Sequence, residues 1–143
     1  MNTGETGVTL AGSQPSTEAK SKRILLVEDD LHVAETLAEL LELEGYRVTV
    51  QHDALAALEQ VRRDWADLVL CDLTLPGEMD GFGFARACRA DSVLRGLHLV
   101  AVSGYDRPED RRRARASGFD GLVGKPVDID AIHAAVGEGR QAA

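Results

Sequence analysis

Five polar side chains with chemistry of their own stand directly after short apolar runs of the chain. They are Glu28, Asp29, Asp72, Ser103 and Lys125. Carboxylates that crowd together repel one another, and a lysine or a hard divalent cation relieves that repulsion. Mg²⁺ prefers oxygen ligands and keeps several waters, which leaves coordination positions for a phosphoryl group. If the fold brings these residues together, their types predict transfer of a phosphoryl group to a carboxylate.

Asp72 is the best candidate for the nucleophile, because it stands alone at the end of the central apolar run. A carboxylate that attacks a phosphoryl donor forms an aspartyl phosphate. Glu28 and Asp29 are better placed to hold a metal ion or its bound water. The metal and Lys125 would stabilise charge on the phosphoryl oxygens. Taken singly, each residue could equally cap a helix or begin a turn. The prediction therefore depends on all five residues lying together at one edge of a sheet.

Short apolar runs alternate with helical patterns between residues 22 and 137. We expect strands at residues 23–27, 47–51, 67–71, 98–102 and 121–124, and helices at 31–44, 53–63, 84–90, 108–116 and 128–136. Parallel strands need crossover connections, so this alternation predicts an α/β doubly wound parallel sheet with helices on both faces. Ligands of such sheets bind beyond the carboxyl ends of the strands, which is where the five polar side chains fall.

The apolar pattern of each helix predicts the face that turns toward the core. Helical spacing places Val33, Leu37, Leu40 and Leu41 on one face of the first helix, and Leu55, Leu58 and Val61 on one face of the second. The helix at 108–116 carries almost no large apolar side chain, so it must be loosely held. We expect its arginine cluster, between Arg107 and Arg115, to be a solvated face offset by nearby acids in preference to a docking surface.

Length and composition exclude several classes of protein. The chain of 143 residues fits one folded domain. A net charge of −8 and an aromatic content of 4% disfavour a nucleic-acid binder. Two cysteines exclude a disulfide framework, and no apolar stretch reaches the roughly 18 residues of a membrane span. We expect a cytoplasmic protein with a disordered tail at 1–21, a domain at 22–137 and a short tail at 138–143.

The motifs at the strand ends, in this order, resemble the receiver domain of two-component response regulators. The residues that carry the resemblance are ILLVEDD at 24–30, DLVLCDLTLPG at 67–77, MDG at 79–81, VSG at 102–104 and KP at 125–126. The resemblance covers about residues 22–136 and is highly specific. It implies a flavodoxin-like (βα)₅ fold with strand order 2-1-3-4-5, and a signalling receiver that catalyses only its own phosphorylation and dephosphorylation.

The resemblance also implies partners and a phosphorylation site. A histidine kinase or a histidine phosphotransfer protein would phosphorylate Asp72, and this would switch contacts with a downstream protein. Ser103 would hydrogen-bond the new phosphoryl oxygens, and Lys125 would form an ion pair with them. The peptide bond between Lys125 and Pro126 is expected to be cis, an isomer that X-Pro bonds tolerate.

A metal site follows from the same resemblance. Mg²⁺ would be held by Asp29, Asp72 and the backbone carbonyl of Thr74. Glu28 would occupy the outer acidic position.

Four positions depart from the commonest family pattern or tune it. Glu78 lengthens the loop beside the phosphoacceptor by one residue, which is expected to affect kinase choice. Leu122 stands at the switch site, where an aromatic residue is usual, so we do not expect the familiar paired motion of a serine and an aromatic side chain. Thr74 and Tyr105 border the path of hydrolytic water and would tune the lifetime of the phosphoryl group. Leu122, with GFD at 118–120 before it and KPVD at 125–128 after it, looks most like the receivers of hybrid histidine kinases, although we expect a stand-alone receiver here.

Two other function classes stay open. A pseudo-receiver would act as an interaction module without phosphorylation, but the full set of acids, hydroxyl and lysine argues against it. An Mg²⁺-dependent phosphatase of the haloacid-dehalogenase type would need a second aspartate two residues after the nucleophile, where this chain has Thr74.

Overall fold

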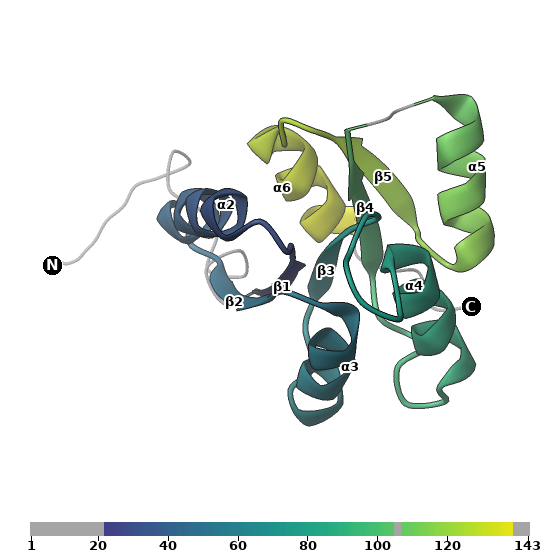
Figure 1. The fold of residues 1–143 in the computed structure, drawn as a ribbon. Helices are drawn as coiled ribbons and strands as arrows, with labels where there is room; N and C mark the ends of the chain where they lie inside the picture. The colour runs from purple at the N-terminus through teal and green to yellow at the C-terminus, as the bar shows by residue number, and fades with distance from the viewer. Residues whose placement is uncertain (1–21, 105–106, 139–143) are drawn as a thin grey trace, which may run out of the picture.

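The computed structural model describes residues 22–104 and 107–138, in which strands and helices alternate (Figure 1). The strands are β1 (Arg23–Val27), β2 (Arg47–Gln51), β3 (Leu68–Asp72), β4 (Leu99–Ser103) and β5 (Gly121–Gly124). The helices are α2 (Leu31–Leu43), α3 (Ala54–Arg63), α4 (Gly81–Ala90), α5 (Pro108–Ser117) and α6 (Ile129–Glu138). The expected tail at 1–21 and residues 139–143 lie outside the described residues.

The strands form one parallel sheet in the order β2-β1-β3-β4-β5, which confirms the expected doubly wound topology. Helices cover both faces of the sheet (Figure 1), and the buried side chains between the sheet and the helices form two hydrophobic cores. One core contains apolar residues of α3, α4 and α5, and the other contains those of α2 and α6. Strands β3 and β4 are buried along their whole length, as expected for central parallel strands, while the edge strands β2 and β5 are only partly covered.

Aspartates fix the starts of three helices at the same end of the sheet. Asp30 accepts hydrogen bonds from the amides of His32 and Val33 and so caps α2. Asp53 caps α3, and Asp80 caps α4 by accepting from the amide of Gly83 at 2.9 Å. Helix α4 therefore begins at Gly81, three residues before the expected start at 84, because Asp80 caps a helix where the sequence indicated only a loop.

The predicted core faces of α2 and α3 are partly wrong. In α2 the buried residues are Ala34, Leu37 and Leu41, whereas Val33 and Leu40 are exposed. In α3, Leu55 is exposed, and Ala54 and Ala57 pack on the sheet beside Leu58 and Val61. Small alanines bring each helix close to the sheet, and this rotates the larger side chains outward. Helix α5 buries only Ala114 and Ser117, which agrees with a loosely held helix.

Helix α6 is attached to α2 by one apolar and one polar contact region. Ile132 is fully buried in the core that α2 also lines. His133 lies between the end of α2 and the following turn, where Nδ1 contacts the hydroxyl of Tyr46 and Nε2 lies 2.9 Å from Oε1 of Glu44.

Among residues 22–104 and 107–138, no helix has both the length and the apolar character that a bilayer crossing requires.

Candidate phosphoryl-acceptor site

Strand pairing brings the predicted functional residues to one edge of the sheet. Val27 at the end of β1 is in register with Cys71 of β3, so Glu28 and Asp72 follow neighbouring positions. Asp72 is in register with Val102 of β4. Ser103 at the end of β4 is in register with Gly124, one residue before Lys125, and it is buried.

Three carboxylates converge at this edge. Glu28, Asp29 and Asp72 each offer one carboxylate oxygen, and these oxygens lie within 4.8 Å of one another. Glu28 and Asp72 are buried, whereas Asp29 is exposed. A partly open set of carboxylate oxygens suits Mg²⁺, which takes few protein ligands and completes its shell with water. The donor set therefore fits a divalent cation.

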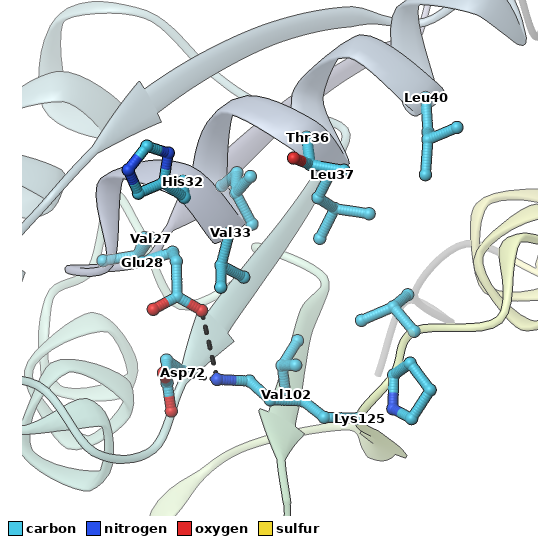
Figure 2. A pocket seen from close by; sticks show the side chains of 13 residues that line it. Val27, Glu28, His32, Val33, Thr36, Leu37, Leu40, Asp72, Val102 and Lys125 are labelled. Atoms are coloured by element: carbon cyan, nitrogen blue, oxygen red, sulfur yellow. Dashed lines mark hydrogen bonds and ion pairs between the residues drawn. The ribbon is translucent and has the colours of Figure 1, made fainter.

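Lys125 supplies the positive charge next to these acids. Its Nζ lies 2.9 Å from Oδ2 of Asp72 and 3.1 Å from Oε1 of Glu28, so the ammonium bridges two carboxylates from different strands (Figure 2). The Lys125–Pro126 peptide bond is cis, as expected.

Burial and ion pairing act in opposite directions on the pKa values of Glu28 and Lys125. Burial raises the pKa of Glu28, although the Asp30 amide and Lys125 partly oppose the shift. Burial also disfavours the charged form of Lys125, but hydrogen bonds to Asp72 and Glu28 outweigh it and raise the pKa of Lys125. The lysine is therefore held as a cation in contact with the acids at neutral pH.

Backbone groups hold the acids in place. The amide of Thr74 donates to Oδ1 of Asp72 at 3.0 Å, and the amide of Asp30 donates to Oε2 of Glu28 at 3.1 Å. One oxygen of Asp72 thus faces the loop and the other faces Lys125.

Residues 24–137 match the family described as the response regulator receiver domain. This chain belongs to that family. Receiver domains are signalling modules of two-component systems, so the expected family and fold are confirmed.

Relatives of this receiver include proteins much longer than the matched region. It is 35% identical over 126 residues to the sensor histidine kinase AruS of Pseudomonas aeruginosa, a match that covers 87% of this chain and 12% of AruS. It is 32% identical to the phosphate regulon transcriptional regulatory protein PhoB of Escherichia coli, over 74% of this chain and 46% of PhoB. The chain thus spans less than half the length of either relative.

A solved receiver structure shows the same fold. The receiver domain of the sensor histidine kinase PA1611 from Pseudomonas aeruginosa superimposes with a TM-score of 0.74 at 27% identity, over 82% of this chain and 95% of that one. That structure holds a magnesium ion coordinated in its active site cleft.

The predicted tuning residues of this receiver have different surroundings. Thr74 is exposed directly beside Asp72. Leu122 is buried in β5, and its carbonyl accepts a hydrogen bond from Arg111 of α5 at 3.3 Å. Tyr105 lies outside the described residues.

Two residues of this site were not found by the sequence reasoning. A ring nitrogen of His52, which follows β2, lies 2.8 Å from the backbone carbonyl of Glu28 and so steadies the loop after β1. Gly81 lets the start of α4 approach Asp72, because a Cβ at this position would overlap the backbone carbonyl of that residue. The MDG motif contained Gly81, but nothing in the sequence indicated which backbone it approaches.

An apolar groove adjoins the site and runs along α2. It has a volume of about 620 Å³, with Glu28, Asp72 and Lys125 at one end (Figure 2). Val33, Leu37 and Leu40 of α2 line it, as do Pro126 and Val127. The outward-facing side chains that the core prediction misplaced, Val33 and Leu40, are thus part of this groove.

Proposed function

We propose that this receiver takes up a phosphoryl group on Asp72 from a histidine kinase or a histidine phosphotransfer protein, with Mg²⁺ bound beside it. The observation that carries the proposal is the convergence of three carboxylates with Lys125, whose Nζ lies 2.9 Å from Asp72. Asp72 ends a rigid buried strand, so a nucleophilic oxygen is held in one place at the open edge of the sheet.

The chemical step is an in-line displacement at phosphorus. An oxygen of Asp72 forms a bond to phosphorus while the bond from phosphorus to the donor nitrogen breaks, and the donor imidazole leaves with its electron pair. The amide of Thr74 fixes one Asp72 oxygen, which leaves the carboxylate oriented during the attack. Lys125 would move its contact from the carboxylate to the transferred phosphoryl oxygens and balance their charge.

Side chains of Glu28, Asp29 and Asp72 and the backbone carbonyl of Thr74 would hold the metal. Mg²⁺ neutralises charge on phosphoryl oxygens during transfer. The magnesium ion in the related PA1611 receiver supports this assignment. Glu28 is the most enclosed of the acids, and we place it as the outer member of the set that holds metal-bound water.

The phosphoryl group would act on the rest of the molecule through β4 and β5. Ser103 ends β4, and its carbonyl accepts from the amide of Lys125 at 2.9 Å, so the two phosphoryl contacts are coupled. Leu122 fills the buried switch position, and no aromatic side chain moves there. The result would be a changed contact with a downstream protein.

The phosphodonor would reach Asp72 from the open edge of the sheet. Leu31 and Val33 at the start of α2 are exposed, and Val33 lines the apolar groove together with Asp72 and Lys125. Exposed apolar side chains next to a phosphoacceptor support docking of a protein donor.

The test is phosphorylation of the purified protein by acetyl phosphate or phosphoramidate with and without Mg²⁺, read by intact mass. We expect the mass of one phosphoryl group to be gained only with Mg²⁺, and to be absent in Asp72→Asn. Asp53→Asn is the matched control, because asparagine caps a helix as well as aspartate does and the residue lies outside the acidic cluster.

Uptake by Asp72→Asn would show that the site assignment is wrong. If the protein neither takes up phosphoryl groups nor binds Mg²⁺, the interaction module that works without phosphorylation is favoured. Steady release of phosphate from small phosphomonoesters would instead favour the phosphatase class.

A further inference from the structure

Another pocket lies at the amino ends of β1 and β2, at the edge of the sheet opposite Asp72. Its volume is about 210 Å³. The first residues of these two strands, Arg23 and Arg47, line it together with Gln60 of α3 and Trp65, which follows α3. The phosphoacceptor chemistry uses none of these four side chains.

The two arginines of this pocket point to the same face of the sheet. Arg23 is in register with Arg47, and neighbouring strands lie about 4.8 Å apart, so the two positive side chains repel each other. Nη1 of Arg23 pairs at 2.6 Å with Oδ1 of Asp64, the acid that lines the pocket. Within residues 22–104 and 107–138, the side chain of Arg47 has no acidic or hydrogen-bond partner. One positive charge of the pocket is therefore left unbalanced.

The neighbouring polar side chains of the pocket can donate hydrogen bonds to an anion. The side-chain oxygen of Gln60 accepts from Nε2 of Gln51 at 3.2 Å, which leaves the side-chain nitrogen of Gln60 as the group that can donate. Thr49 also lines the pocket, and its hydroxyl can donate. Together with Arg47, these groups suit a carboxylate, which guanidinium binds through charge-assisted hydrogen bonds.

Trp65 gives the pocket an aromatic wall. It is 46% exposed, and it is the only tryptophan of the chain. A Cβ at Gly96 would lie 3.9 Å from its ring, so the connection into β4 lies close to one edge of the indole. An aromatic ring of a ligand can pack against such a surface in an offset-stacked or edge-to-face arrangement.

The size of the pocket limits what it can hold. A cavity of about 150 Å³ accepts one benzene molecule, whereas drug-sized ligands take roughly 300 Å³ or more. A volume of about 210 Å³ therefore suits one aromatic ring with a small charged group, and it is too small for a nucleotide.

We propose that this pocket binds a small carboxylate that carries a single aromatic ring. The carboxylate would contact Arg47 and Gln60, and the ring would pack against Trp65. The bound anion would also relieve the repulsion between Arg23 and Arg47. Because the pocket lies at the edge of the sheet opposite Asp72, binding needs neither Mg²⁺ nor phosphorylation.

The test is a titration of the purified protein with sodium benzoate, with sodium chloride used to keep the ionic strength constant. Binding is followed by the fluorescence of Trp65 and by the NMR shift of its indole N–H. We expect saturable binding with a dissociation constant in roughly the millimolar range for so small a ligand. Benzamide has the same ring without the charge, and acetate has the charge without the ring, so both should bind more weakly.

Arg47→Gln should weaken benzoate binding by about tenfold, because it removes the charged donor. Arg112→Gln is the matched control, since it makes the same change at an exposed site on α5 and should keep binding. Circular dichroism shows whether each variant folds. Trp65→Ala provides a second variant, which should also lose benzoate binding, as read from the amide NMR shifts of Thr49 and Gln60.

Three results would each overturn the proposal: failure of benzoate to bind, equal binding of benzamide, or an equal loss in Arg112→Gln. Acetate or inorganic phosphate that binds as tightly as benzoate would show that the ring contributes nothing, and this would overturn it as well. The same benzoate affinity in Asp72→Asn would show that the pocket acts independently of the phosphoacceptor, as proposed.

Discussion

Gly81 is a residue at which a single methyl group should disturb the backbone of Asp72. A Cβ there would overlap the carbonyl oxygen of Asp72 and lie 2.7 Å from Cα of Leu73, and both are backbone atoms that have no room to rotate away. We expect Gly81→Ala to lower the free energy of unfolding by about 1–3 kcal/mol, as overpacking does, measured by urea denaturation.

The control for Gly81 is Gly137 in α6, where a Cβ meets nothing within 4 Å. Gly137→Ala should be neutral or should stabilise the protein by up to about 1 kcal/mol. Equal destabilisation by both variants would show that lost glycine flexibility, and not the approach to Asp72, causes the effect.

The two cysteines should be inert in the folded protein. Cys71 and Cys88 are fully buried, and burial raises the pKa of Cys88 to about 12 and that of Cys71 well above its ordinary value. Only the thiolate reacts, so iodoacetamide should label neither residue at neutral pH, nor at pH values where a free cysteine is already mostly thiolate. Mass spectrometry of native and urea-unfolded samples measures this, and fast native labelling of either thiol would contradict it.

At the residue scale, the sequence predicts which side chains reach the site but not what holds them. Asp72 and Lys125 could be identified because strand ends meet at one edge of a parallel sheet. The contact from His52 to the carbonyl of Glu28 could not, because it depends on the path of the loop after β2. Local loop geometry leaves no periodic pattern in a sequence.

At the scale of elements, Arg89 of α4 joins segments that the sheet alone does not fix. Its guanidinium donates to the carbonyls of Arg95, Leu97 and Gly118, and to Oδ2 of Asp120 at 3.0 Å. The connection into β4 and the turn before β5 are therefore held by one side chain.

Arg89→Ala should lower the free energy of unfolding by roughly 3 kcal/mol, because it leaves several enclosed acceptors without a donor. Thermal or urea unfolding measures the loss. The matched control is Arg86→Ala on the same helix, an exposed residue whose contact with Ser117 is a long 3.4 Å, and it should change stability by less than about 0.5 kcal/mol. Similar losses in both variants would mean that helix propensity, and not the carbonyl contacts, causes the effect.

The bounds of a helix or strand could be predicted where its capping residue and its apolar run indicated the same ends. They could be predicted less well where these two signals differed. The strands differ from expectation by at most one residue at each end, because each is a short apolar run between polar loops. The start of α4 was missed because Asp80-Gly81 resembles a turn. The outward rotation of α2 could not be predicted, since it depends on how closely Ala34 packs against the sheet.

At the scale of the whole molecule, metal binding should stabilise the fold. The acidic cluster joins β1 to β3, so a cation that binds only the folded form shifts the unfolding equilibrium. At a Mg²⁺ concentration ten times the dissociation constant, we expect a gain of about 1.4 kcal/mol, seen as a rise of several degrees in Tm.

Sodium chloride at matched ionic strength controls for general screening and should give a smaller rise. Asp72→Asn should lose most of the Mg²⁺ effect, because one of the three carboxylates is gone. An equal rise with sodium chloride would show that screening of the −8 net charge, and not a metal site, stabilises the protein.

The topology of the whole molecule was predictable because alternating strands and helices leave few ways to build a parallel sheet. The groove beside the site was not, because its volume depends on the separation of α2 from the segment around Pro126 and Val127. Contacts between residues far apart in the sequence, such as those of His133 with Glu44 and Tyr46, link α6 to the segment after α2.

The two edge strands of the sheet, β2 and β5, affect how this protein behaves at high concentration. An open strand edge can recruit a strand from another molecule and start a fibrous aggregate. Here β5 has only four residues, two of them glycine, and β2 begins with the exposed, charged Arg47. Both edges therefore make poor templates, so copies of this chain that meet at high concentration have to associate through their helices and not by extending the sheet.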